Sequence, residues 1–241
     1  MNKELRLNVL KEDWINCGRC SLCETRKNVV FGEGNPNAKI VIVGEAPGPE
    51  EDKTGRPFIG ETGKILNTFL RAAQLSRSED VYLINTIGCR PTVTNTNDES
   101  GESVTENREP SKEERVACKQ RVLDTIYLID PYLIIALGKT ALQTLLGRVN
   151  VITKMRGNIY TMHMAGKQIG EIRYPVLAMY HPSFLARNHD YSNPEGVWFQ
   201  TGRDFKLATE VIDYIDLKYN GTERKRYDQT EAEPEEETAD D

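Results

Sequence analysis

Short runs of aliphatic and β-branched residues alternate along this chain with stretches of helical periodicity. Four runs have the length and composition of buried strands: "KIVIVG" (39–44), "VYLIN" (81–85), "YLIIAL" (132–137) and "YPVLAMY" (174–180). Helical spacing occurs between and after them, over 61–74, 111–130, 138–147 and about 199–217. This order predicts an α/β fold, a three-layer α/β/α sandwich around a central, largely parallel sheet.

Chemically rich segments follow three of the predicted strands. They are "GEAPG" after the first strand, "INTIGCRP" at the end of the second and "YHPSFLARN" after the last. Ligands of open α/β sheets bind at the carboxyl ends of the strands, so the site is expected there. The polar stretch 92–110 is predicted to be a flexible loop. Ser111 with Glu114 predicts a capping box at the start of the next helix.

The 241 residues, 38% of them hydrophobic, suit one domain over 1–220 followed by a disordered acidic tail at 221–241. Residues 228–241 hold eight acidic side chains and no basic one, which leaves a balance of about +2 for the rest of the chain. The net charge of −6 therefore does not exclude a nucleic-acid partner. The chain contains no run of about 18 apolar residues and its N-terminus lacks the apolar core of a signal peptide.

We therefore expect a soluble, monomeric protein without membrane contact in the cytoplasm, the host cytoplasm if the protein is viral. Structural disulfides are rare in that compartment. The close pair Cys17 and Cys20 in "NCGRC" thus favours metal or redox chemistry over a disulfide.

The order of several motifs resembles that of the family 4 uracil-DNA glycosylases, the iron–sulfur branch of that superfamily. The motifs are "CGRC", "VVFGEGNPNAKIVIVGEAPG", "EEDKTGRPFIG", "VYLINTIGCRP", "IIALGKTAL" and "YHPSFLARN". The resemblance covers roughly residues 14–215. It implies an enzyme that extrudes uracil from single- or double-stranded DNA and hydrolyses its N-glycosidic bond, leaving an abasic site.

The resemblance implies a [4Fe–4S] cluster held by Cys17, Cys20, Cys89 and Cys118, with Cys23 as a spare. A zinc ion on the same four sulfurs is the alternative, because ligand type alone does not separate the two. The 28 residues between Cys89 and Cys118 exceed what the resemblance leads us to expect. We therefore do not infer DNA contacts for the segment between Cys89 and Cys118 from the resemblance.

Three residues carry the chemistry that the resemblance implies for the base. Phe58 would stack on the uracil face, and Asn85 would pair with O4 and N3–H, which cytosine cannot reciprocate. His181 would donate to O2 as negative charge develops there. Each also has a plain structural interpretation, as a core aromatic, a turn residue and a loop histidine.

Glu45 matches the "GEAPG" glutamate, and the loop holds no aspartate of the kind that activates water in the best-known uracil glycosylases. The resemblance therefore implies catalysis by stabilisation of the leaving group, helped by backbone N–H groups near Ala46. Glu51 matches a residue near uracil C5, where it could exclude the thymine methyl group. The alternative interpretation is that Glu51 is one of several solvated acidic residues in "PEED".

The segment Ser183, Phe184, Leu185 and Arg187 could insert into the gap left by a flipped base and contact phosphate, as could Lys64 from its helix. A plain surface loop is the alternative. A second function stays open: a non-catalytic relative that binds DNA or a replication partner. In that case, the 92–110 loop or the acidic tail would serve as a docking element.

Overall fold

The computed structural model describes residues 2–96, 103–147, 151–166, 170–188 and 190–219. Six of its strands form one sheet in the order β1-β3-β2-β6-β8-β7. The four inner strands run parallel, and β1 and β7 are antiparallel edges. The strands of this sheet are β1 Glu33–Gly34, β2 Ile40–Gly44, β3 Val81–Asn85, β6 Leu133–Leu137, β7 Ile159–Gly166 and β8 Gly170–Met179.

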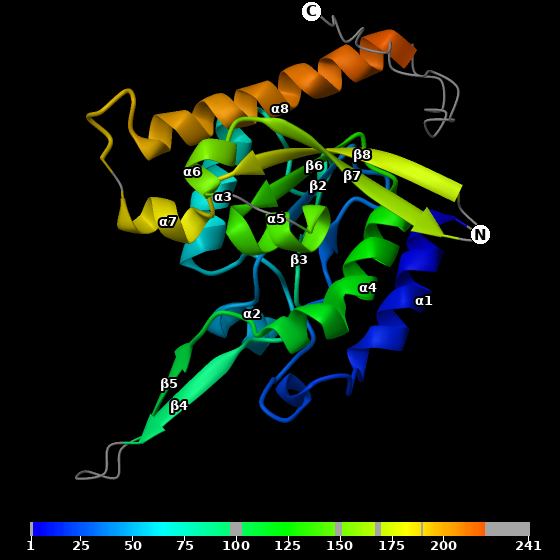
Figure 1. The fold of residues 1–241 in the computed structure, drawn as a ribbon, viewed down its shortest axis with the longest axis vertical. Coiled ribbons are helices and arrows are strands. Elements are labelled where there is room, and N and C mark those ends of the chain that lie inside the picture. The colour runs from blue at the N-terminus through cyan, green and yellow to red at the C-terminus, as the bar shows by residue number, and fades with distance from the viewer. Residues whose placement is uncertain (1, 97–102, 148–150, 167–169, 189, 220–241) are drawn as a thin grey trace, which may run out of the picture.

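Helices cover both faces of the sheet (Figure 1). Their bounds are α1 Lys3–Ile15, α2 Pro49–Thr54, α3 Glu61–Ala72, α4 Lys112–Ile129, α5 Gly138–Leu146, α6 Ile152–Met155, α7 Pro182–Arg187 and α8 Val197–Tyr219, with a 3₁₀ turn at Ser21–Cys23. The capping box at the start of α4 is present as predicted, with Ser111 as its first member.

Successive residues of each inner strand point to opposite faces and so build two separate cores. In β2, Val41 and Val43 pack with α1, α4 and α5, whereas Ile40 and Ile42 pack with α3, α7 and α8. Strands buried on both faces explain why their sequences are continuous apolar runs. The predicted three-layer sandwich is confirmed.

The prediction of a loop over 92–110 is wrong. Strands β4 Thr92–Thr96 and β5 Ser103–Asn107 pair antiparallel as a hairpin that projects from the body of the molecule (Figure 1). Its Thr and Val residues have high β-propensity, but nearly all of its side chains are exposed. Without a buried face the segment has no apolar alternation, which is the usual sequence signal of a strand.

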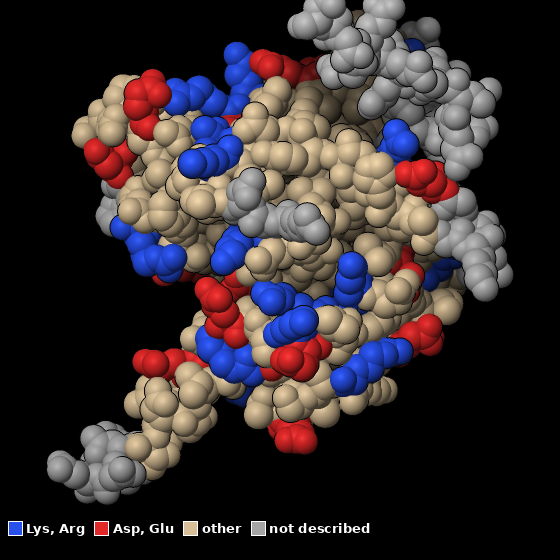
Figure 2. Space-filling view, viewed as in Figure 1, with Lys and Arg blue, Asp and Glu red and all other residues tan. Residues whose placement is uncertain are grey.

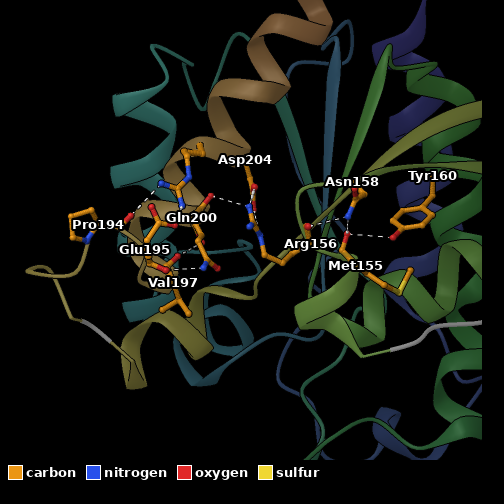
Figure 3. Close-up of polar contacts among 11 residues, drawn as sticks. Met155, Arg156, Asn158, Tyr160, Pro194, Glu195, Val197, Gln200 and Asp204 are labelled. Carbon is orange, nitrogen blue, oxygen red and sulfur yellow. Dashed lines mark hydrogen bonds and ion pairs between the residues drawn. The ribbon is translucent and has the colours of Figure 1, made fainter.

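A polar network joins the end of α6 to α8 (Figure 3). The Arg156 guanidinium pairs with the buried Asp204 carboxylate and also donates to the Gln200 carbonyl. Burial raises the pKa of Asp204, and the charge of Arg156 opposes that shift. Arg156 also lies 5.9 Å from the ring centroid of Tyr180, the residue before His181. The network therefore fixes α8 beside the end of β8.

No helix in the described part of the chain is long and apolar enough to cross a membrane. The predicted cytoplasmic location and monomeric state stay predictions. The predicted tail at 221–241 lies outside the described residues.

Candidate active site

A cleft of about 650 Å³ opens at the carboxyl ends of the inner strands, where the sequence places the site. Figure 2 shows the molecule hollowed between its main body and the base of the hairpin, with basic and acidic side chains both near the hollow. The predicted site residues that line the cleft are Glu45, Ala46, Glu51, His181, Ser183, Phe184 and Arg187.

Phe58 and Asn85 converge on the end of β2 and are almost fully buried. A Cβ atom added to Gly44 would lie 2.4 Å from Phe58 Cζ and 2.5 Å from Asn85 Oδ1, so only glycine leaves room for both side chains. Among the described residues, the side-chain amide of Asn85 has no hydrogen-bond partner. The amide atoms are not cut off from solvent, because Arg121 Nε is the one enclosed side-chain nitrogen or oxygen in the described residues that lacks a partner. The Asn85 amide is therefore accessible to a polar ligand.

Phe58 has a left-handed backbone, with φ of +50°. Such a conformation in a non-glycine residue is strained and persists only where its surroundings hold it. The Arg77 guanidinium donates to the carbonyls of Pro57 and of Phe58, the latter at 2.9 Å. A Cβ on Gly63 would lie 1.9 Å from the Phe58 carbonyl oxygen. Arg77, which sequence reasoning missed, therefore holds the backbone of Phe58, and Gly63, also missed, leaves room for that backbone.

His181 ends the loop after β8 and caps the N-terminus of α7. Its Nδ1 accepts from the Ser183 backbone N–H at 3.2 Å and lies 2.8 Å from the Ser183 hydroxyl. Because Nδ1 accepts, the proton of the neutral ring is on Nε2. Removal of the ring from water lowers the pKa of His181 to about 4, and the charge of Arg187 acts in the same direction. The ring is thus a neutral donor at ordinary pH.

The two glutamates of the cleft have different environments. Thr140 on α5 donates its hydroxyl to Glu45 Oε2 at 2.6 Å. Glu51 is 5% exposed, and its carboxylate accepts backbone N–H groups from Gly48, Ile59 and Gly60 at 2.9–3.1 Å. This arrangement excludes the solvated-acid interpretation of Glu51. The carboxylate instead joins the "GEAPG" loop to the loop that carries Phe58.

The segment after His181 divides between surface and core. Phe184 lines the cleft and packs on Tyr180 with ring centroids 5.0 Å apart, and Arg187 is exposed at the rim. Leu185 is 1% exposed and belongs to the core, so in this conformation it is not available to insert into DNA. Lys64 is exposed on α3 but does not line the cleft. Sequence reasoning missed Lys139 and Arg108, which do line it.

Three of the five cysteines, Cys20, Cys89 and Cys118, lie together beside helix α4, which carries Cys118. Cys89 and Cys118 are buried with Leu22, Val29 and Ile87, and Cys20 packs against this group. Burial raises the pKa of Cys89 to about 11, which the Arg26 guanidinium opposes and the Cys118 and Cys20 thiols reinforce. Within the described ranges, no group of three or more His, Cys, Asp or Glu side chains is arranged to hold a metal ion.

The fold and the cleft define an α/β protein with a site at the carboxyl ends of its inner strands, although Phe58 and Asn85 are not among the residues that line the cleft. Residues 31–200 match the family model of the Uracil DNA glycosylase superfamily. Over 187 residues the chain is 41% identical to a Type-4 uracil-DNA glycosylase of Thermotoga maritima, covering 77% of this chain and 86% of the relative.

Two further relatives give the same result. A Type-4 uracil-DNA glycosylase of Pyrobaculum aerophilum is 36% identical over 71% of this chain and 80% of its own length. One from Saccharolobus solfataricus is 34% identical over 73% of this chain and 78% of its own length. The chain therefore belongs to the uracil-DNA glycosylase superfamily, as its motifs indicated.

Proposed function

We propose that this protein is a DNA-repair glycosylase that binds uracil flipped out of DNA and hydrolyses its N-glycosidic bond. The observation that carries the proposal is the convergence of the Asn85 and Phe58 side chains on Gly44 at the strand ends. Family membership and the names of the relatives support the same activity.

In this proposal Phe58 and Asn85 select the base. The Phe58 ring supplies a flat apolar surface for stacking, held by Arg77. The Asn85 amide donates to uracil O4 and accepts from N3–H, a pattern that cytosine cannot match. Glu51 holds the two loops at the distance that lets the ring and the amide face one base. Glu51 would also exclude the C5 methyl group of thymine, and displacement of Glu51 would admit that group.

His181 stabilises the leaving group. Cleavage of the N-glycosidic bond leaves negative charge on the base, and the Nε2–H of a neutral imidazole donates to O2 as that charge grows. The Ser183 N–H keeps the ring in the donating tautomer. Backbone N–H groups near Ala46 add to the same effect. Glu45 lines the cleft and accepts from Thr140, and in this proposal it orients the water that attacks the anomeric carbon.

The DNA backbone is held at the rim of the cleft. Arg187 and Lys139 supply positive charge there, whereas the charge of Arg108 is paired with Glu114. Phe184, which lines the cleft, would fill the space of the extruded base. Uracil in single-stranded DNA would need no unpairing before it enters.

We propose that Cys17, Cys20, Cys89 and Cys118 hold a [4Fe–4S] cluster. The donor set fits, because four thiolates bind such a cluster, and Cys20, Cys89 and Cys118 pack in one group. Nη1 of Arg19 lies 3.8 Å from the Cys17 sulfur, and Nη1 of Arg26 lies 3.7 Å from the Cys89 sulfur. The charge of Arg26 opposes the rise in the Cys89 pKa that burial causes. The four sulfurs would still have to draw together around the cluster. Such a cluster would pin the N-terminal loop to α4.

A cleavage assay tests the proposed function. The protein is incubated with a uracil-containing oligonucleotide, single- or double-stranded, and abasic sites are cut with alkali. Cleavage at uracil but not at cytosine or thymine is expected. Asn85→Asp, which keeps shape but exchanges the donor for an acceptor, should lose about 1–3 kcal/mol against uracil and gain some activity on cytosine. No cleavage by the parental protein would leave the non-catalytic alternative.

Gly44→Ala should strongly impair excision without unfolding the protein. Its methyl group would overlap both Phe58 and Asn85, so one of them must move by about 1 Å, and such a displacement can cost about 100-fold in rate. Gly202→Ala is the matched control, because its methyl group would have no neighbour closer than 4.0 Å. Single-turnover rates with the uracil oligonucleotide compare the two. Parental activity in Gly44→Ala would place the base elsewhere.

A further inference from the structure

Arg121 on α4 is fully buried, with no measurable exposure, and it is the largest such side chain in the described part of the protein. Its charge has no carboxylate partner among the described residues. Its Nε is the one buried side-chain nitrogen or oxygen, within those residues, that lacks a hydrogen bond. Burial of an unpaired guanidinium is costly, so a feature of this kind calls for a specific role.

The two terminal nitrogens of Arg121 donate to two carbonyls on different segments. Nη1 donates to the Phe31 carbonyl at 2.7 Å, and Nη2 donates to the Asn85 carbonyl at 2.5 Å. Asn85 is the last residue of β3, and Phe31 lies just before β1. The guanidinium therefore reaches from the helical layer to the strand end that carries the uracil-binding amide.

The register of the sheet explains why an arginine stands there. β1 pairs with β3 through Glu33↔Leu83 and Gly34↔Tyr82. Extension of the same register would place Phe31 opposite Asn85, but the strand pairing ends before that point. The planar fork of Arg121 bridges the two carbonyls that continued pairing would have brought together. Hydrogen bonds from the fork thus take the place of a strand neighbour at Asn85.

We propose that Arg121 is the positioning residue for Asn85, an inference that rests on the proposed function. By fixing the Asn85 carbonyl, it fixes the direction in which the side-chain amide leaves the strand end. Uracil recognition then depends on Arg121 although this side chain does not touch the base. A lysine would keep the charge but could not bridge two carbonyls in one fixed geometry.

A double-mutant cycle tests the coupling. Single-turnover excision is measured for the parental protein, Arg121→Lys, Asn85→Ala and the double variant. Arg121→Lys is expected to slow excision about tenfold in the parental background and less than about twofold in the Asn85→Ala background. Affinity for uracil-free DNA should not change. Arg115→Lys, on the same helix but bonded to Gln143, is the matched control and should be silent in both backgrounds.

Equal losses in the two backgrounds would show that Arg121 acts independently of Asn85 and would overturn the inference. Thermal unfolding of Arg121→Lys and Arg121→Gln accompanies the kinetics. If neither variant folds at the assay temperature, Arg121 is purely structural and the inference is also overturned. Absence of uracil cleavage by the parental protein would remove the proposed function and this inference together, whereas parental cleavage with additive losses removes only the inference.

Discussion

Replacement of His181 by alanine should slow single-turnover excision of uracil by about 10²- to 10³-fold, or roughly 3–4 kcal/mol in the transition state. The affinity for uracil-containing DNA should hardly change. This result is expected because the Nε2–H bond to O2 strengthens only as negative charge develops on the base. The loss should therefore appear in the chemical step and not in binding.

His163→Ala is the control for this experiment. That histidine lies on edge strand β7, pairs with Glu171 and does not line the cleft. The His163→Ala variant should excise uracil at the parental rate. If His181→Ala also keeps the parental rate, the leaving group is stabilised by other groups and the assignment of His181 is wrong.

The low pKa of His181 also has a consequence for stability. The folded value is about 4 and the unfolded value is about 6.5, so between these values the unfolded chain binds more protons. The contribution of His181 to the free energy of unfolding is fully present above pH 6.5 and is lost as the pH falls toward 4. His181→Asn keeps a cap acceptor for α7 without this titration. Its unfolding midpoint should fall less steeply than that of the parental protein over this window.

The inner sheet could be predicted from the sequence because its strands are buried on both faces and read as continuous apolar runs. Edge strand β7 could not, because only Tyr160, Met162 and Met164 turn inward, and methionine is not a typical strand residue. The β4–β5 hairpin was missed for the same physical reason, since it buries almost nothing.

Some residues of the candidate site could also be predicted from the sequence, whereas others could not. Glu45, Asn85 and His181 follow strand ends and could be placed from local motifs. The supporting partners of Glu45, Phe58 and Asn85 could not be placed in this way, because Thr140, Arg77 and Arg121 reach those residues from other segments of the chain. Leu185 belongs to the core because α7 is amphipathic, and a motif that reads "SFLAR" does not reveal which apolar side chain turns inward.

The proposed cluster ligands predict opposite results for serine substitutions at two cysteines, Cys89 and Cys23. Cys89→Ser should abolish the bound cluster, whereas Cys23→Ser should leave it intact, although Cys20 and Cys23 lie in the same short loop. Cys89 is buried in the apolar group with Cys118, and an uncharged serine hydroxyl there replaces a thiolate by a much poorer iron ligand. Cys23 lies outside that group, as Cys17 does, and the resemblance to the family assigns the remaining ligand position to Cys17.

Iron and acid-labile sulfide are measured in protein purified without oxygen, together with the visible absorbance of the cluster. About four of each per chain are expected for the parental protein and for Cys23→Ser, and almost none for Cys89→Ser. These readouts do not depend on glycosylase activity, so they test the ligand set separately from the proposed reaction. Stoichiometric zinc in a colourless parental protein would show that the same sulfurs hold a different metal. Loss of iron in Cys23→Ser instead of Cys89→Ser would show that the wrong cysteine was left out.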